Sequence, residues 1–345
     1  MRKLACVKKI AEIKPIPGAD QICAYRVDGW WIVDKVGAHK VDDLVVAVEI
    51  DSFVPHELAP FLSRGQEPRE YNGVKGNRLR TVRLKGQLSQ GLLLPFGVIM
   101  SNYEGEACST DWNLGDDVTE LLGIQKWEAP IPAQLGGQIL GVFPHWGKKT
   151  DAERCQNLVE EIQQAYDNDT VFEITIKLDG TSMSAGMGPG GDFHVCSRNL
   201  SLKLDQTGNT YVDVAKAYDL ERKVVSSAQP MMISGEIIGE GIQKNQEKLK
   251  GHDFYVFNIW DALEQKYMTR EERIKVVKEF GLKHAPILHE AVTLRSLGLD
   301  SVEKILKFAE GPSLNAPSRE GLVFKSVDGE FMFKAISNHW LTKNE

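Results

Sequence analysis

Short hydrophobic runs separated by turns dominate the first third of the chain. Valine- and isoleucine-rich segments recur at short intervals, with Gly, Pro and Asp residues between them, at positions 24–27, 31–36, 44–50, 79–84 and 91–95. Short strands divided by tight turns are typical of a small closed barrel or a sandwich. The pattern predicts an OB-type β-barrel over residues 1–127, a fold that often carries nucleic acid on one face.

The rest of the chain mixes helical and strand-like patterns. Residues 128–142 include two prolines and three glycines without a helical period, which predicts a linker. Capping-box sequences predict helix starts at Thr150 and Thr269, and apolar spacing predicts a further helix over about 213–225. Strands and helices do not alternate as βαβ units. Residues 143–345 are therefore predicted to form an α+β domain with mainly antiparallel sheets.

A glycine cluster at 186–191 has the spacing Gly-x-Gly-x-x-Gly. In dinucleotide-binding folds this motif leads into a helix whose N-terminus binds the pyrophosphate. Here Pro189 lies inside the cluster, and a strand-like segment at 193–197 follows it. The sequence therefore predicts a hairpin loop at this position and argues against a dinucleotide site.

Composition is that of an ordinary soluble globular protein. The chain has 345 residues, of which 42% are hydrophobic and 26% are charged. Its five cysteines are scattered without a Cys-x-x-Cys pair, which predicts reduced thiols and no zinc site. No apolar run approaches the length of a membrane span, and the first residues do not resemble a secretory signal. We expect a monomer in the cytoplasm or another reducing intracellular compartment, without a membrane partner.

Charge is distributed unevenly along the chain. The net charge of −7 argues against a protein that coats nucleic acid non-specifically. Residues 64–85 nevertheless hold seven positive and two negative side chains, a net charge of +5. Such a segment can contact phosphates or can form a solvated loop, and an irregularity near Thr81 would bring its charges to one face. The predicted nucleic-acid contacts are Arg78, Arg80, Arg83 and Lys85.

The stretch 174–181 is the first candidate for chemistry. A β-branched run carries Lys177 to its end, and Gly180 follows closely. Side chains alternate along a strand, so Lys177 and Asp179 are expected on the same face. This arrangement predicts a lysine nucleophile beside an acid that serves a metal or a hydroxyl. An ordinary ion pair next to a hairpin turn is the alternative, because Lys-x-Asp-Gly fixes only three residues.

Four further stretches place polar residues at strand ends or turns, at positions 196–199, 234–236, 319–325 and 331–336. Together they bring lysines, an arginine and acids into one β-rich domain. A lysine must be partly neutral to attack, and nearby positive charge or a metal lowers its pKa. Mg²⁺ prefers carboxylates, water and phosphate oxygens, and other lysines can neutralise a leaving pyrophosphate. This inventory indicates nucleotidyl transfer.

These stretches occur in the order of the motifs of covalent nucleotidyltransferases, the polynucleotide ligases and mRNA capping enzymes, and the resemblance covers about residues 143–340. The segments 9–20, 28–30 and 88–92 resemble the N-terminal OB domain of one clade of ATP-dependent RNA ligases. DNA ligases and capping enzymes usually carry their OB domain after the catalytic domain. The domain order here therefore favours an RNA ligase, with a DNA ligase or guanylyltransferase and a non-enzymatic nucleic-acid binder as the alternatives.

The resemblance implies an adenylyltransferase domain over 143–345, ATP with Mg²⁺ or Mn²⁺ as cofactors, and RNA or an RNA-containing nicked duplex as substrate. Lys177 is expected to take AMP from ATP, pass it to a 5′-phosphate end, and allow a 3′-OH to displace it. The expected metal ligands are Asp179, Glu236 and Glu320.

The resemblance also implies roles around the nucleotide. Arg198 is expected near phosphate and Asn199 near ribose or the RNA end. Glu236 matches the acid that contacts ribose, and Phe257 matches the aromatic residue that stacks on adenine. The residues expected to neutralise or contact phosphate are Arg154, Lys325 and Lys334.

The last motif departs from many relatives, which carry Lys-x-Lys there. Positions 332 and 336, two residues on either side of Lys334, are Met332 and Ile336. The role of a second lysine in this motif is therefore open, and Lys203 or Lys343 could supply it.

Overall fold

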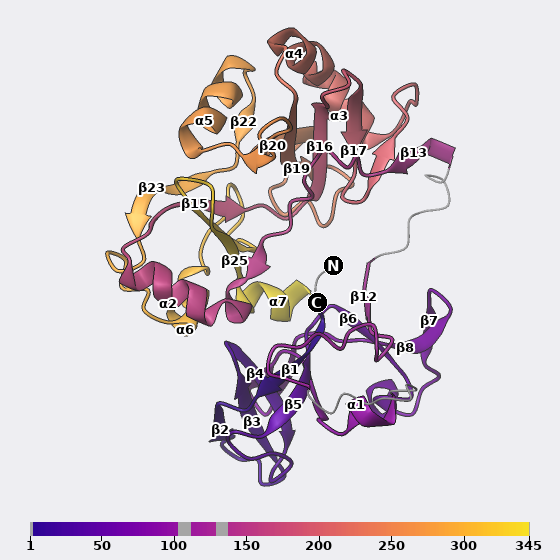
Figure 1. The fold of residues 1–345 in the computed structure, drawn as a ribbon, viewed down its shortest axis with the longest axis vertical. Helices are drawn as coiled ribbons and strands as arrows, with labels where there is room; N and C mark the ends of the chain where they lie inside the picture. The colour runs from indigo at the N-terminus through magenta and orange to yellow at the C-terminus, as the bar shows by residue number, and fades with distance from the viewer. Residues whose placement is uncertain (1–2, 103–111, 129–136, 345) are drawn as a thin grey trace. The chain divides into compact units, whose positions relative to one another are not determined.

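The computed structural model describes residues 3–102, 112–128 and 137–344. The chain divides into two compact units, Met1–Pro130 with Leu341–Glu345, and Ile131–Trp340 (Figure 1). The predicted domain boundaries at 127 and 142 stay predictions, because most of the proposed linker lies outside the described residues. In the described part of the chain, no helix is long and apolar enough to cross a membrane.

The first unit consists of small antiparallel sheets around the core residues Val7, Val46, Val48 and Leu94. The sheets contain β1 (Ala5–Lys9), β5 (Leu44–Val48) and β11 (Leu92–Pro95); β2 (Glu12–Pro15), β3 (Ile22–Val27) and β4 (Trp30–Lys35); β6 (Ser52–Pro55), β7 (Arg69–Tyr71), β8 (Val74–Arg78) and β12 (Gln125–Lys126); and β9 (Val82–Leu84) with β10 (Gln87–Ser89). Two short helical turns, η1 (Pro60–Ser63) and α1 (Val98–Ser101), accompany them.

The predicted strand over 79–84 is wrong at its start. Residues 79–81 lie between β8 and β9, and only Val82–Leu84 forms a strand. The backbone of Leu79 is hydrogen-bonded at the start of β6: its N–H donates to the Ser52 carbonyl, and its carbonyl accepts from the Asp51 N–H. Leu79 and Thr81 are both buried, which holds the segment between the two strands against the core. Arg78 and Arg83 therefore lie on strands of different sheets, Arg80 lies between these strands, and Lys85 lies in the turn after β9.

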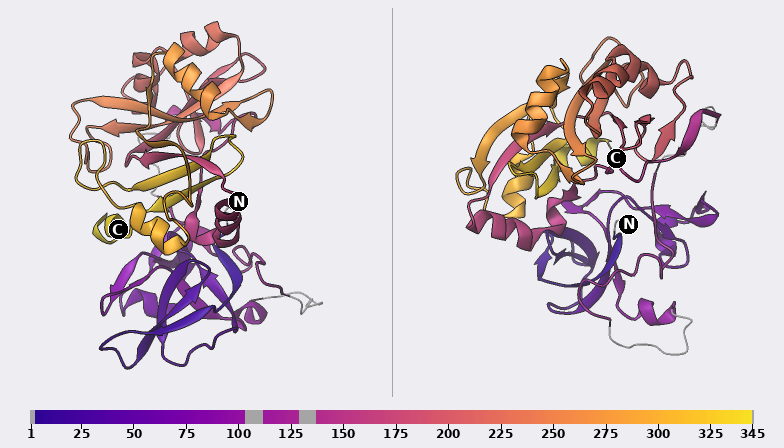
Figure 2. Two further views of the ribbon diagram at one scale, coloured as in Figure 1. Left: turned by 90° about the vertical axis from the view of Figure 1, so that its left-hand side faces the viewer. Right: turned by 45° about the horizontal axis from the view of Figure 1, so that its top comes forward.

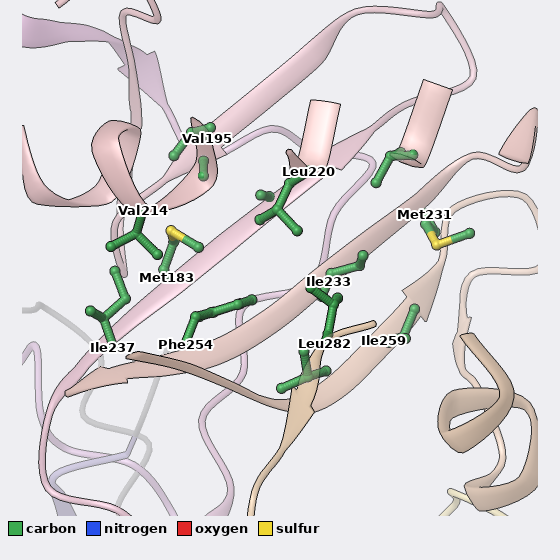
Figure 3. Close-up of a cluster of buried hydrophobic side chains, with 14 of the residues drawn as sticks. Met183, Val195, Val214, Leu220, Met231, Ile233, Ile237, Phe254, Ile259 and Leu282 are labelled. Carbon is green, nitrogen blue, oxygen red and sulfur yellow. The ribbon is translucent and has the colours of Figure 1, made fainter. Parts of the chain in front are cut away.

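The second unit contains an eight-stranded and a five-stranded sheet. The larger sheet holds β13 (Ile139–Val142), β16 (Thr181–Met187), β17 (Phe193–Cys196), β18 (Leu200–Leu202), β19 (Met231–Gly239), β20 (His252–Asp261), β21 (Lys266–Tyr267) and β22 (Lys283–His284). Helices α3 (Thr210–Ala217), α4 (Leu220–Ser227) and α5 (Arg270–Glu279) cover one face of it (Figures 1 and 2). The core between them includes Met183, Ile233 and Phe254 (Figure 3).

The smaller sheet holds β14 (Glu153–Arg154), β15 (Val171–Lys177), β23 (Ile287–Thr293), β24 (Gly321–Ser326) and β25 (Met332–Ile336). Its apolar face packs on η3 (Cys155–Asn157), α2 (Val159–Asp167) and α6 (Val302–Phe308) through Phe172, Phe324 and Phe333. Helix α7 (Asn338–Asn344) follows the sheet. The pairing within it is antiparallel except between β14 and β25.

Local helix signals succeeded where no sheet competed for the backbone. The capping box at Thr269 forms as predicted. The one at Thr150 does not: Glu153 lies in β14, paired with β25, and α2 begins only at Val159. The predicted helix over 213–225 is two helices, separated at Asp219, whose φ of 55° is left-handed. The glycine cluster forms the predicted hairpin, because β16 and β17 pair antiparallel across it.

Candidate functional site

The register of the five-stranded sheet gathers four cationic side chains on one face. Lys177 pairs with Gly321, and Lys325 pairs with Glu173, four residues before Lys177 on β15. Residues two or four apart on a strand share a face, as do directly paired residues. Lys334 pairs with Val323, which lies between Gly321 and Lys325 on β24, and Arg154 pairs with Lys334. The cations on this face are therefore Arg154, Lys177, Lys325 and Lys334.

The eight-stranded sheet contributes a second polar face, opposite its helix-covered core. Glu236 pairs with Ser182, and two residues away Ser234 pairs with Ser184 and Asn258. The hydroxyls of Ser184 and Ser234 are hydrogen-bonded at 2.8 Å. The alternate positions on these strands, including Ile233 and Ile237, point into the apolar core instead.

Phe257 lies in a β-bulge of β20, where it contacts Lys325 of the five-stranded sheet. Ser234 opposes Asn258 while the next residue, Gly235, opposes Val256, so Phe257 is the extra residue on β20. A bulge re-aims a side chain, and bulges are common beside active sites. The Lys325 ammonium from the other sheet donates a hydrogen bond to the Phe257 carbonyl and lies 5.9 Å from the centroid of its ring.

Lys177 forms an ion pair at the centre of this arrangement. Its Nζ donates to Oε2 of Glu320 at 2.7 Å, and both side chains are largely buried, at 27% and 13% exposure. Burial lowers the pKa of Lys177, but the charges of Glu320, Glu236 and Asp179 outweigh it and raise the pKa above its ordinary value. The amine is therefore held as an ammonium, and it must lose a proton before it can attack an electrophile.

The acids around Lys177 share one electrostatic environment. Burial raises the pKa of Glu236 to about 8, with Lys177 opposing the rise and Glu320 adding to it. Burial and the charge of Glu320 also raise the pKa of Asp179, whose Oδ2 accepts from Nε2 of Gln246 at 2.9 Å. Both carboxyls thus hold their protons more tightly than in water, and additional positive charge would favour their ionised forms.

A divalent cation fits this donor chemistry. Among the residues that the structure describes, no group of three or more His, Cys, Asp or Glu side chains is arranged to hold a metal by itself. Mg²⁺ and Mn²⁺ favour oxygen ligands, and Mg²⁺ typically binds through one or two carboxylates and completes its shell with water and phosphate. The carboxylates of Asp179, Glu236 and Glu320 suit a cation that arrives with a phosphate ligand.

Gly180 allows the turn after Lys177 to lie against β19. A Cβ at this position would lie 2.2 Å from the Ile237 carbonyl oxygen and 2.9 Å from Cγ of Glu236. The Gln243 side chain also donates to the Gly180 carbonyl at 3.2 Å. The glycine of the Lys-x-Asp-Gly motif is thus required by the close approach that brings Glu236 toward Lys177.

Asp151 links two predicted phosphate contacts, and the sequence did not single it out. Its Oδ2 accepts from Arg198 at 2.7 Å and its Oδ1 accepts from Lys334 at 2.8 Å. Beside it, Lys149 donates to Oδ1 of Asn199 at 3.2 Å. The sequence pattern places Asp151 only in a capping box. Its two partners lie 47 and 183 positions away along the chain, so no local signal indicates this role.

Two further predicted phosphate contacts, Arg154 and Lys325, are buried side chains of the same sheet face. Arg154 and Lys325 are each 5% exposed. Burial and the charge of Arg273 lower the pKa of Lys325 well below its ordinary value, although Glu173 opposes them. Met332 accepts a hydrogen bond from Asn258 through its sulfur, and Ile336 is buried. Lys203, one candidate for the second lysine, follows β18 of the eight-stranded sheet and donates to the Gly137 carbonyl.

In the first unit the four predicted nucleic-acid residues have different environments. Arg78 forms an ion pair with Asp51 and lies 5.9 Å from the centroid of the Trp127 ring. Arg80, Arg83 and Lys85 are exposed, and Arg83 donates to the Gly86 carbonyl at 3.0 Å. The structure therefore separates Arg78 from the other three.

Neutralising Glu236 should stabilise the protein increasingly as the pH rises above 4.5, with the full gain above pH 8. Its pKa of about 8 in the folded chain exceeds the ordinary 4.5. Stability from this group is therefore complete below pH 4.5 and lost as the pH rises through 8. We expect Glu236→Gln to raise the free energy of unfolding by roughly 2 kcal/mol at pH 8.5 and to change it little at pH 4.5.

Urea unfolding at both pH values measures this effect. Glu240→Gln is the matched control, because Glu240 is exposed and lies on the same stretch of chain. An equal gain at both pH values, or an equal gain in the control, would contradict the expectation.

Comparison with known proteins gives two family matches and a set of similar structures. An OB-fold domain model matches residues 4–96, and an RNA ligase model matches residues 170–336. Structures of Naegleria gruberi RNA ligase are similar over nearly the whole chain: a mutant with AMP and Mn (43% identity, TM-score 0.88, 100% of both chains covered) and the protein with pyrophosphate (44%, 0.87, 99% of this chain and 98% of that one). A mutant with ATP and Mn is 43% identical, with a TM-score of 0.88 over 99% and 100% of the chains.

No curated protein sequence matches the chain significantly. The predicted fold class, an OB-type barrel followed by an α+β domain of antiparallel sheets, is confirmed by the family match and the similar structures.

Proposed function

The chain belongs to the RNA ligase family, and we propose that it joins RNA 3′-OH and 5′-phosphate ends through a lysyl-AMP, with sealing of nicks as its main reaction. The observation that carries this proposal is the Lys177–Glu320 pair, set among Glu236, Asp179 and the cations of both sheets. A largely buried lysine surrounded by acids at the end of a strand suits a nucleophile whose proton is removed only when a nucleotide arrives.

In the first step Lys177 attacks the α-phosphorus of ATP. A bond forms between Nζ and phosphorus, the bond from phosphorus to the pyrophosphate oxygen breaks, and Nζ loses its proton. Glu320 accepts a hydrogen bond from Nζ at 2.7 Å, so it orients the nitrogen and can receive the proton. Gln246 fixes the carboxylate of Asp179 beside this pair.

Positive charge is needed at the α-phosphate, which Lys177 attacks, and at the pyrophosphate, which leaves. Mg²⁺ or Mn²⁺, held by Asp179, Glu236 and Glu320 together with phosphate oxygens, would supply charge that favours the neutral amine and the transition state. Arg198 and Lys334 would bind the leaving pyrophosphate, with the buried Arg154 and Lys325 behind them. The structures of the Naegleria gruberi enzyme with ATP and Mn and with pyrophosphate support these ligands for this chain.

The nucleoside would bind between the two polar faces. Glu236 would accept from the ribose hydroxyls, and Phe257 would stack on adenine, a role that its position in the β20 bulge supports. Asn199 would contact the ribose or the RNA end. We keep residues 143–345 as the adenylyltransferase domain, residues 128–142 as the linker and residues 1–127 as the domain that binds the RNA duplex.

Sealing assays on nicked duplexes test the proposal, with RNA or DNA placed separately on each side of the break. We expect sealing with ATP of nicks that carry RNA at the break, and none when the 5′-phosphate is replaced by a 5′-hydroxyl. Sealing of all-DNA nicks alone, or covalent labelling by GTP in place of ATP, would instead indicate a DNA ligase or a guanylyltransferase.

Removing two exposed charges from the β9–β10 hairpin should weaken RNA binding. We expect Arg83→Ala combined with Lys85→Ala to lower duplex affinity about fivefold and to reduce the slope of log affinity against log salt by about 1.5, because each phosphate contact contributes about 0.7–0.9. Fluorescence anisotropy over a salt series measures both. Lys35→Ala with Lys40→Ala removes the same charge from exposed positions elsewhere in the unit. Equal losses in both double variants would show a net-charge effect without a defined binding face.

A further inference from the structure

Asp151 holds two cations that come from different sheets. Arg198 lies in the turn between β17 and β18 of the eight-stranded sheet, and Lys334 lies on β25 of the five-stranded sheet. The Asp151 carboxylate uses one oxygen for each of them, at 2.7 Å and 2.8 Å. The three side chains range from 13% exposure for Lys334 to 49% for Arg198, so they remain within reach of a ligand from solvent.

A carboxylate in this position imitates one edge of a phosphate group. Both present two negatively charged oxygens that can accept from an arginine and a lysine at once. Two cations with one carboxylate carry one net positive charge, whereas the same cations without it carry two. Asp151 therefore lowers the attraction of this pair for an incoming phosphate while it keeps both side chains in place.

We propose that Asp151 is an internal anion that competes with pyrophosphate for Arg198 and Lys334. This inference rests on the proposed function, in which these two cations bind the pyrophosphate end of ATP. When pyrophosphate leaves, the Asp151 carboxylate takes over both cations. The vacated phosphate position is then no longer strongly cationic, and pyrophosphate rebinds poorly.

The consequence is a bias against reversal of the first step. In the reverse reaction a pyrophosphate oxygen bonds to the phosphorus of lysyl-AMP, the phosphorus–nitrogen bond breaks, ATP forms, and Nζ of Lys177 takes up a proton. By competing for the pyrophosphate site, Asp151 favours transfer of AMP onward to the RNA 5′-phosphate. Asp151 is thus a positioning residue that acts through Arg198 and Lys334.

The test compares Asp151→Asn with the wild-type protein in its adenylylated form. The amide keeps the shape and one acceptor oxygen but removes the charge. We expect the pyrophosphate concentration that gives half-maximal ATP release from lysyl-AMP to fall about fivefold, the size of effect that a modest ion pair produces. Transfer of AMP to a 5′-phosphate RNA end should change less than twofold. Asp151→Glu, which restores the charge, should return the pyrophosphate dependence toward wild type.

Asp300→Asn is the matched control, because Asp300 forms an ion pair with Lys304 on the surface of the same unit. A purely structural link between the sheets predicts the opposite result for Asp151→Asn: weaker pyrophosphate binding, slower adenylylation and a lower melting temperature. That outcome, an unchanged pyrophosphate dependence, or unfolding of both Asp151→Asn and Asp151→Ser would overturn the proposal. Absence of any lysyl-AMP in the wild-type protein would instead contradict the proposed function itself.

Discussion

Replacing Lys177 with alanine is expected to abolish covalent labelling of the chain by ATP that carries its label on the α-phosphate. Lys177 is the lysine that donates to Glu320 at 2.7 Å, within the electrostatic reach of Asp179 and Glu236. Without Nζ no phosphoramidate bond to AMP can form, so labelling should be absent and not merely slower. Denaturing gel electrophoresis of the protein after incubation with labelled ATP and Mg²⁺ or Mn²⁺ measures it.

Lys177→Arg separates the nucleophile from the charge. The guanidinium preserves an ion pair with Glu320, but it stays protonated at all accessible pH values and cannot attack. We expect this variant to fold like the wild type and to take no label. Both variants should still seal a nick whose 5′ end already carries AMP, because that reaction does not need the lysine nucleophile. Labelling of either variant would contradict the assignment of Lys177.

The pH dependence of labelling follows from the same ion pair. The surrounding carboxylates raise the pKa of Lys177 above its ordinary value of 10.5, so only a small fraction of the amine is neutral near pH 7. That fraction grows about tenfold per pH unit below the pKa. The single-turnover rate of adenylylation should therefore rise with pH between about 6 and 9, until a later step limits it.

Much of the active face could be predicted from the sequence, because it follows from strand alternation and motif order. Lys177, Lys325 and Lys334 lie on three strands that the apolar pattern indicates. The register of these strands, together with the alternation of side chains along each, places the three lysines on one face. Phe257 was indicated by resemblance alone. Its orientation depends on a bulge on β20, which no pattern of hydrophobic residues indicates.

The contacts that sequence analysis missed join residues far apart in the chain. Asp151 contacts Lys334, 183 positions away, and Gln246 contacts Asp179, 67 positions away. The same long-range pairing explains the wrong helix start at Thr150, since Glu153 joins β25 instead of completing a capping box. Local propensity is a weak prior there, because the pairing of β14 with β25 decides the conformation.

Neutralising the buried Glu173 should lower the free energy of unfolding more than any other single substitution proposed for this chain. Glu173 is fully buried and forms ion pairs with Arg273 through Oε1 and with Arg270 through Oε2. Arg273 is itself buried and also donates to Nε2 of His284 at 3.1 Å. Burial, with the charges of Arg273 and Lys325, lowers the pKa of His284 to about 3, so the imidazole stays neutral and adds no further positive charge beside Arg273.

Glu173→Gln therefore leaves Arg273 as a buried positive charge without the carboxylate that it contacts through Oε1 of Glu173. Removing one partner of a buried pair typically costs about 3–5 kcal/mol. We expect a fall of that size in the free energy of unfolding and a drop in melting temperature of about 10 °C. Calorimetry or urea unfolding followed by circular dichroism measures it. Adenylylation should slow as well, because Glu173 opposes the lowering of the pKa of Lys325, and its loss favours the neutral lysine.

Glu290→Gln is the matched control. Glu290 also forms an ion pair with Arg270, at 3.1 Å, but its side chain is 76% exposed. An exposed pair of this kind contributes at most about 1 kcal/mol, so the same chemical change should have little effect. Replacing Glu173 and Arg273 together with leucine and methionine should recover part of the stability, since an apolar pair leaves no uncompensated charge in the interior. Equal losses from Glu173→Gln and Glu290→Gln would show that burial of the Glu173–Arg273 pair does not determine its energetic contribution.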